Sequence, residues 1–269
     1  MVARSRHKPL QHIDWPVGEL TDSHSYDVIG HGYTRRRRAD PRIATAIAHA
    51  LGPGERVLNV GAGTGSYEPP DCRVLAVEPS TLMIAQRPAS AAPVIRAVAE
   101  ALPFASGSFD ASMAIMSAHH WQDPEAGLRE VGRVTRSRVV LFTWDPGSGD
   151  PFWLDEYLPE LRGLDCKQSA HVVQLAATLG RLERRSVPIP ADCTDGLLGA
   201  YWRRPEAYLD PDVQSGISTF QRLDAAIVAR GVQRLAADLE SGRWDQKHEL
   251  LRNANTLDLG YVLLIADVR

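Results

Sequence analysis

The chain has 269 residues, of which 44% are hydrophobic and 23% are charged, so its composition excludes collagen-like, coiled-coil and disordered proteins and predicts a normal apolar core. Lysine plus arginine number 30 and aspartate plus glutamate 33, and the resulting net charge of -3 provides no positive field for nucleic acid. The three cysteines, Cys72, Cys166 and Cys193, lack Cys-x-x-Cys spacing and are predicted to be reduced thiols rather than disulfides or zinc ligands.

The N-terminal region is basic, but no apolar run follows it, so a secretory signal peptide is not predicted. No apolar run in the chain approaches the roughly 20 residues that a membrane-spanning helix needs. We therefore expect a cytoplasmic protein with no membrane span and no nucleic-acid partner.

The first regular elements alternate between helix and strand. A helix is predicted from Asp40, which can cap it, through Pro41 in its first turn to Leu51. Short runs of apolar and β-branched residues follow, of the kind found in strands buried on both faces. These runs are 56–60, 73–77, 94–96, 111–116 and 139–143. They predict a mostly parallel sheet that is covered by helices and binds ligands at the carboxyl ends of its strands.

The second half of the chain has a different texture, rich in aromatic residues, proline and charge. Helical periods are predicted at 155–161, 170–179 and 217–239, and a last apolar strand at 260–266. If 182–187 and 261–266 are the sixth and seventh strands, the stretch 188–256 lies where the parallel strands end. We expect a core of 40–187 and 257–269 with 188–256 as a lid for substrate recognition, although a purely structural cap fits equally well.

A glycine-rich loop is the sharpest local signal. The strand 56–60 runs directly into Gly61, Gly63 and Gly65, and glycine allows a tight turn whose N–H groups approach a ligand. Glu78 ends the next strand, where its carboxylate can accept hydrogen bonds from both ribose hydroxyls of an adenosine cofactor. Ser66 stands at the last position of the dinucleotide fingerprint, so the match to NAD-binding loops is partial.

Further motifs follow the loop in a fixed order. They are Glu78-Pro79-Ser80, Ala97 to Phe104, Gly107 to Asp110, His119 to Pro124 and Arg129 to Val134. With the loop, they make the chain from Asp40 to about Thr143 closely resemble the class I S-adenosylmethionine-dependent methyltransferases of the ubiquinone/menaquinone-biosynthesis type (methyltransferase type 11). The resemblance implies a Rossmann-like, doubly wound α/β fold, with a mostly parallel seven-stranded sheet, an antiparallel last strand and a helical lid insertion. It also implies S-adenosyl-L-methionine as cofactor and methyl transfer to a small organic acceptor.

The resemblance assigns a role to individual cofactor-binding residues. The methionine part is assigned to Gly61, Ala62, Gly63 and Gly65, and the ribose to Glu78. Pro79 and Met83 would line the adenine, Ala99 and Glu100 would meet its edge, and the backbone carbonyl of Ser117 would approach the methionine amine. Tyr33 and Arg37, in an N-terminal segment 1–39 over the cofactor site, look like a clasp whose guanidinium binds the methionine carboxylate. A solvated basic stretch is the alternative.

Three positions depart from the family pattern. Asn59 stands where an aspartate is usual, and residues 133–138 lack the usual Pro-Gly-Gly turn. Val98 replaces an aspartate that often reads the adenine amino group, and an aliphatic side chain cannot accept that hydrogen bond.

Methyl transfer from a sulfonium is an in-line displacement, which needs alignment of the reactants but no protein nucleophile or metal. A hydroxyl, phenol or ammonium acceptor must lose a proton, and His119 and His120 follow the fourth strand, where the base would be needed. We prefer His120, with Trp121 as an apolar wall; the alternative is that both histidines are structural. For the whole chain, an NAD(P)-dependent oxidoreductase and a non-catalytic cofactor-binding protein of the same fold are the competing hypotheses.

Overall fold

The computed structural model describes residues 37–268, apart from the side chains of Arg162 and Asp165. Tyr33 and most of the predicted N-terminal segment 1–39 lie outside the described residues. At the start of the described chain, Asp40 caps the first helix, because its carboxylate accepts a hydrogen bond from the Arg42 N–H.

Seven strands form one sheet in the order β3-β2-β1-β4-β5-β9-β6. Their bounds are β1 Arg56–Val60, β2 Arg73–Val77, β3 Val94–Ile95, β4 Phe109–Ile115, β5 Thr135–Trp144, β6 Gly180–Ser186 and β9 Tyr261–Val268. Neighbouring strands from β3 to β5 run parallel, whereas β9 is antiparallel to both β5 and β6. The predicted doubly wound α/β sheet with an antiparallel last strand is therefore confirmed.

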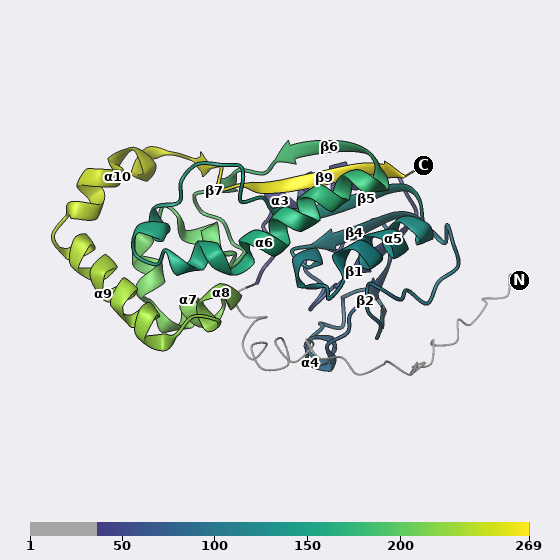
Figure 1. Cartoon of the computed structure of the whole chain (residues 1–269), viewed down its shortest axis with the longest axis horizontal. Coiled ribbons are helices and arrows are strands. Elements are labelled where there is room, and N and C mark those ends of the chain that lie inside the picture. Colours follow the sequence, from purple (N-terminus) through teal and green to yellow (C-terminus); the bar gives the residue numbers. More distant parts are fainter. Residues whose placement is uncertain (1–36, 269) are drawn as a thin grey trace, which may run out of the picture.

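Helices cover both faces of this sheet, as Figure 1 shows: α3 (Pro41–Leu51) on one face, and α5 (Pro124–Val134) with α6 (Glu160–Leu175) on the other. Ile43 and Ile47 of α3 belong to the same buried cluster as Val57 of β1. Leu58, the next residue of β1, packs instead in the cluster that contains Leu128 and Val131 of α5. Successive residues of β1 thus feed two apolar layers, as expected for a strand buried on both faces.

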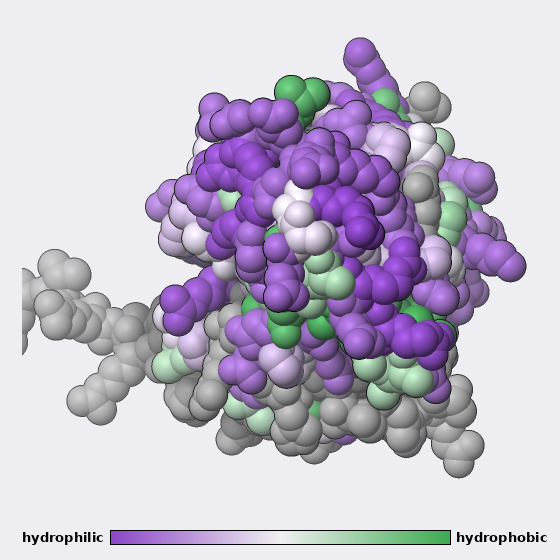
Figure 2. Space-filling model, turned by 90° about the vertical axis from the view of Figure 1, so that its left-hand side faces the viewer, coloured by the Kyte–Doolittle hydropathy of each residue, from purple (hydrophilic) through white to green (hydrophobic). Residues whose placement is uncertain are grey.

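A helical lobe, residues 188–256, extends beyond the sheet (Figure 1). Two short antiparallel strands, β7 (Ile189–Pro190) and β8 (Thr256–Leu257), join its ends. Between them lie η4 Leu198–Tyr201, η5 Pro205–Leu209, α7 Pro211–Ser215, α8 Ser218–Gln221, α9 Ala225–Glu240 and α10 Arg243–Asn253. The side of the molecule at this end is mostly hydrophilic in Figure 2, and Leu250, at 85% exposed, is the only large exposed hydrophobic side chain among the described residues.

The helical lobe has an apolar core of its own, and that core extends outside the lobe. Trp153 and Tyr157, from the segment before α6, pack with Tyr208, Phe220 and Trp244 of the lobe. The indole N–H of Trp153 donates to the Trp202 carbonyl at 2.8 Å. The lobe is thus anchored on the segment before α6, which includes η2 (Trp153–Glu156).

The predicted elements differ from the observed ones mainly in the second half. The helical period at 217–239 is divided into α8 and α9, because Asp224 caps a new helix by accepting from the Ala226 N–H at 2.7 Å. The period at 155–161 covers the end of η2 and the start of α6, and the period at 170–179 is the end of α6 followed by η3 (Ala176–Leu179). The remaining short elements are α4 Thr81–Ala85 and η1 Ala118–His120.

The three cysteines are free thiols, as predicted. Within the described part of the chain, no helix is both long and apolar enough to cross a bilayer.

The contact between α9 and the segment before α6 predicts a stability effect at Gly231. An added Cβ there would lie 2.3 Å from Leu158 Cδ2 and 2.7 Å from the Tyr157 carbonyl oxygen. Leu158 is buried, so overpacking should exceed the gain in helix propensity, and we expect Gly231→Ala to lower the free energy of unfolding by about 1 to 3 kcal/mol.

Gly163 is the matched control, because it lies inside α6 and nothing is within 4 Å of its added Cβ. Gly163→Ala should raise the free energy of unfolding by about 0.5 to 1 kcal/mol. Urea denaturation of both variants measures the two effects, and equal stability of the two proteins would contradict the packing described for α9.

Candidate functional site

The glycine loop after β1 lies across the end of β2. The N–H groups of Gly61 and Ala62 both donate to the Val77 carbonyl, at 2.9 and 3.0 Å. Gly61 has a φ of +67°, and a Cβ on it would lie 2.7 Å from the Ser117 Cβ. Gly63, with a φ of +51°, faces open space, since the nearest atom to its added Cβ is Met83 Cε at 3.9 Å. Glycine is therefore needed at Gly61 for packing, and at Gly63 it leaves room for a ligand.

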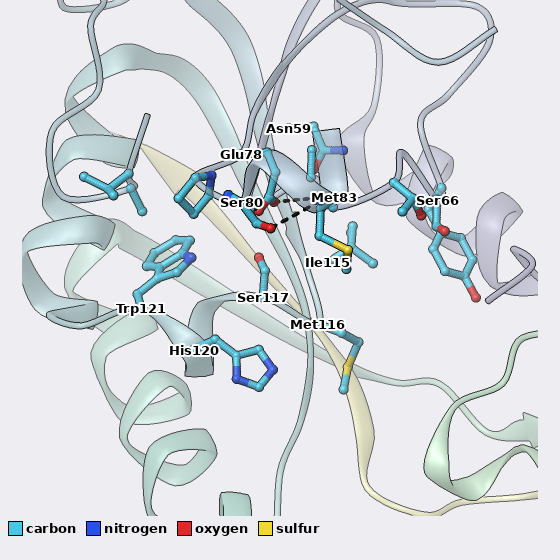
Figure 3. Close-up of a pocket in the computed structure, with 18 of the residues that line it drawn as sticks. Asn59, Ser66, Glu78, Ser80, Met83, Ile115, Met116, Ser117, His120 and Trp121 are labelled. Carbon is cyan, nitrogen blue, oxygen red and sulfur yellow. Dashed lines mark hydrogen bonds between the residues drawn. The ribbon is translucent and has the colours of Figure 1, made fainter. Parts of the chain in front are cut away.

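Glu78 follows β2 and is buried beneath the loop. Its two carboxylate oxygens accept hydrogen bonds from the backbone N–H of Gly63 at 2.7 Å and from that of Ser80 at 3.0 Å. Figure 3 shows Glu78 and Ser80 on the wall of the pocket, between Asn59 and Trp121. A carboxylate oxygen has more than one acceptor position, so Glu78 can hold the loop and still accept hydrogen bonds from a ligand.

One pocket contains most of the residues that the sequence singled out. Its empty space is about 1120 Å³, a volume that includes open solvent at its mouth. The predicted residues that line it are Arg37, Gly61, Ala62, Gly63, Glu78, Pro79, Met83, Ala99, Glu100, Ser117 and His120. The carboxyl ends of β1, β2 and β4 thus bring together segments that are distant in sequence.

Two predicted residues do not line this pocket. An added Cβ on Gly65 would lie 3.0 Å from Ala91 Cβ and 3.1 Å from Glu68 Oε2. Gly65 therefore faces Ala91 and Glu68 rather than the pocket. His119 is buried, and its ring centre lies 3.9 Å from that of His120. Tyr33 lies outside the described residues, so its role stays a prediction.

The pocket also includes residues that sequence reasoning missed. Tyr67 and Met116 line it and are the described non-glycine residues with positive φ, at +67° and +49°. Such conformations are costly for residues with a side chain and concentrate at functional sites. Neither residue type predicts a positive φ, so no signal in the sequence could have identified them.

Arg37 lines the pocket and is held by the helical lobe. Its Nε lies 2.6 Å and its Nη2 3.3 Å from the two carboxylate oxygens of Asp195, which is fully buried. The Tyr67 hydroxyl donates to the same carboxylate at 2.7 Å, and burial raises the pKa of that phenol well above its ordinary value, with Asp195 adding to the shift. Asp195 therefore connects the lobe to both the glycine loop and the pocket wall.

His120 is half-buried and lines the pocket, where Figure 3 labels it below Ser117. Burial lowers the pKa of His120 well below 6.5, and His119, Arg222 and Arg37 lower it further, because nearby positive charge disfavours the protonated ring. The imidazole is therefore neutral at pH 7 and presents a nitrogen lone pair.

Two buried polar atoms on the pocket wall have no hydrogen-bond partner in the described part of the chain. They are Oδ1 of Asn59, an acceptor, and Nε1 of Trp121, a donor. An unsatisfied buried group costs about 1 to 3 kcal/mol, so both atoms point to a ligand that carries donors and acceptors. The apolar side chains of Pro79, Met83 and Val98 supply a surface for a flat base. Together with Glu78, these residues fit an adenosine cofactor with a polar chain, and the described residues contain no group of three or more potential metal ligands.

Known proteins resemble this chain over the part that contains the glycine loop and Glu78. Residues 58–143 match the family model of a methyltransferase domain. A demethylmenaquinone methyltransferase of Mycolicibacterium paratuberculosis is 31% identical over 174 residues, which are 60% of this chain and 73% of that protein. A demethylmenaquinone methyltransferase of Renibacterium salmoninarum is 30% identical over 167 residues, 57% of this chain and 69% of that protein.

The comparison of folds gives the same result. A crystal structure of a candidate methyltransferase from an antibiotic biosynthesis pathway of Anabaena variabilis superposes with a TM-score of 0.79 at 30% identity. The superposition covers 86% of this chain and 98% of that one. These matches do not favour an NAD(P)-dependent oxidoreductase.

The position of Glu78 predicts a loss of ligand affinity on substitution. We expect Glu78→Ala to weaken binding of S-adenosylhomocysteine by about 1.5 to 3 kcal/mol, the range for hydrogen bonds to a charged group. Isothermal titration calorimetry measures this loss. Glu125, exposed on α5 and outside the pocket, is the control, and Glu125→Ala should bind normally. Unchanged affinity in a folded Glu78→Ala protein would exclude the ribose-binding role.

Proposed function

The chain belongs to the class I S-adenosylmethionine-dependent methyltransferases of the ubiquinone/menaquinone type, and we propose that it methylates a small organic acceptor bound beside His120. It binds S-adenosyl-L-methionine and is a methyl-transferring enzyme. The observation that supports the acceptor position is that a single pocket contains the glycine loop, Glu78 and His120. A net charge of -3 favours a small molecule over nucleic acid as the partner, and the three free thiols favour a reducing, cytoplasmic location.

We propose the following roles around the cofactor. Backbone groups of Gly61, Ala62 and Gly63 approach the methionine part, and the Glu78 carboxylate accepts hydrogen bonds from the ribose hydroxyls. The adenine lies against Pro79 and Met83, with its edge toward Ala99 and Glu100. The Ser117 carbonyl approaches the methionine amine. All of these residues line the pocket, which supports their assignment to one ligand. When bound, the cofactor supplies an electrophilic methyl group.

The other end of the pocket is suited to the acceptor. Met116, His120 and Trp121 all line the pocket, and Trp121 and Ser117 both lie close to Gly61. The apolar Met116 and Trp121 side chains limit water around the acceptor, while His120 supplies the polar atom. This arrangement favours an acceptor with one reactive hydroxyl or amine on an otherwise apolar body.

We propose that His120 accepts the acceptor's proton at an imidazole nitrogen as the new bond to carbon forms. Its lowered pKa keeps the ring neutral and able to accept a proton throughout the neutral range. Because the same environment disfavours the imidazolium, the proton then leaves toward solvent. His119 does not line the pocket, and its contact with the His120 ring suits a supporting role.

The helical lobe is proposed as the lid for substrate recognition, with 40–187 and 257–269 as the methyltransferase core and 1–39 as a segment over the cofactor site. The lobe lies beyond the sheet, and its Asp195 accepts hydrogen bonds from Arg37 and Tyr67. Both observations support this role.

The acceptor class is tested with methyl-labelled S-adenosylmethionine and a set of phenols, alcohols, carboxylic acids and amines. Mass spectrometry of the products should locate the label on an oxygen or nitrogen. If S-adenosylhomocysteine binds but no compound is labelled, the non-catalytic hypothesis is favoured. Label on a carbon would overturn the proposed task of His120.

His120 should matter for turnover more than for cofactor affinity. General-base catalysis contributes about 10²- to 10⁴-fold, so His120→Ala should lower kcat by that factor with S-adenosylhomocysteine binding unchanged. A lowered pKa means that the ring is deprotonated at every pH above that value. The wild-type kcat should therefore be level through the neutral range and fall only at a pH well below 6.5.

The pH profile of kcat separates the two histidines. His119→Ala should retain the acidic limb, whereas His120→Ala should lose it. An acidic limb of equal midpoint in the wild type and in His120→Ala would show that another group titrates.

A further inference from the structure

Asn59 is the position at which this chain departs from its family beneath the cofactor loop. It is 1% exposed in β1, where it pairs with Ala76 of β2 and Met113 of β4. Asn59 lines the pocket, and its Oδ1 has no hydrogen-bond partner among the described residues. A buried amide oxygen without a partner requires a donor from a ligand.

A hydrogen bond to Glu68 fixes the orientation of the Asn59 amide. The Asn59 Nδ2 donates to Glu68 Oε1 at 3.2 Å. Glu68 also accepts from Arg87 Nη2 at 2.6 Å and from the Ala92 N–H at 2.8 Å, so its carboxylate is held at both oxygens. An ionised carboxylate only accepts hydrogen bonds, so the amide must turn its nitrogen to Glu68 and its oxygen to the pocket.

The same network holds the glycine loop. Arg87 Nη1 donates to the Gly63 carbonyl at 2.9 Å, and an added Cβ on Gly65 would lie 3.3 Å from Arg87 Nη1. The Arg87 and Glu68 side chains are only 5% and 9% exposed. A buried network thus supports the glycine loop and consists of Asn59, Glu68 and Arg87. Its acceptor without a partner is Asn59 Oδ1, two residues before Gly61.

The donor that suits this acceptor is an ammonium group. The ribose hydroxyls have Glu78 as their acceptor, and the adenine amino group is expected near Ala99 and Glu100. The ammonium of the methionine part has three N–H donors, so it can donate to Asn59 Oδ1 as well as to the Ser117 carbonyl. We infer that Glu68 is a positioning residue, and that the Asn59 Oδ1 it fixes accepts a hydrogen bond from the cofactor's ammonium group. This inference rests on S-adenosylmethionine being the cofactor.

This arrangement explains why asparagine is tolerated where the family has aspartate. The negative charge is carried by Glu68, which contacts Asn59 rather than the ligand, and Arg87 neutralises that charge. An aspartate at 59 would bring a second carboxylate to about the 3.2 Å that now separates Asn59 Nδ2 from Glu68, and like charges at that distance disfavour ionisation of both. A carboxylate can therefore stand at position 59 or at position 68, but not at both.

Three ligands separate ammonium recognition from general packing. S-adenosylhomocysteine carries the ammonium, a deaminated analogue lacks only that group, and 5′-methylthioadenosine lacks the whole amino-acid part. Calorimetry should show Asn59→Leu binding S-adenosylhomocysteine about 10- to 150-fold more weakly, the factor for a hydrogen bond to a charged group. Its affinity for the other two ligands should change less than about twofold.

Glu68→Gln should weaken S-adenosylhomocysteine in the same selective way. A glutamine can donate to Asn59 Oδ1 and so turn the Asn59 nitrogen toward the ammonium. Gln122, the other amide side chain on the pocket wall, is the control, and Gln122→Leu should not discriminate between S-adenosylhomocysteine and the deaminated analogue.

The charge swap tests the positioning role directly. Asn59→Asp alone should weaken S-adenosylhomocysteine and lower the unfolding midpoint, and the double variant Asn59→Asp/Glu68→Gln should recover the affinity. Equal weakening of all three ligands by Asn59→Leu, or no recovery in the double variant, would overturn the inference. Failure of the wild type to bind any of the three would instead contradict the cofactor assignment.

Discussion

The Val77 carbonyl accepts two hydrogen bonds from the loop after β1, and the geometry of the pocket depends on this point. Because the N–H groups of Gly61 and Ala62 donate hydrogen bonds to the same oxygen, the loop must fold over the end of β2. Glu78 follows Val77 directly, so its carboxylate reaches the Gly63 N–H. On the other side, Gly61 lies so close to Ser117 that the end of β4 is fixed against the loop. A local turn thereby sets the positions of three strand ends.

The sequence predicted the parts of the structure that depend on local patterns. Apolar runs identified the strands, Asp40 identified a helix start, and alternating glycines with Glu78 identified the pocket, because each of these signals lies within one element or its neighbour. The ion pair between Arg37 and Asp195 could not be predicted. Its partners are 158 residues apart, and no local sequence pattern links them. The same holds for the positive φ of Met116, which depends on how the end of β4 is fixed by Phe142.

The helical lobe shows how two apolar cores share one chain. Trp153 and Tyr157 come before α6 in the sequence but pack in the core of the lobe, whereas Trp202, inside the lobe, packs in the cluster under α3. Each core therefore contains aromatic residues from the other unit. With Asp195 bound to Arg37 and Tyr67, this exchange restricts how the lobe can move without disturbing the cofactor loop.

The place of β9 in the sheet has a consequence for the order of folding. β6 pairs with β9, and β9 lies between β6 and β5, although the whole lobe separates β6 from β9 in the chain. During synthesis, β1 to β5 can assemble as they emerge, but the edge of β5 stays unpaired until β9 has been made, after the whole lobe. Such long-range pairing slows folding and leaves an unpaired strand edge open to aggregation in the meantime. β5 and β6, the two strands between which β9 inserts, carry six charged side chains that keep their unpaired edges polar: Arg136, Arg138, Arg181, Glu183, Arg184 and Arg185.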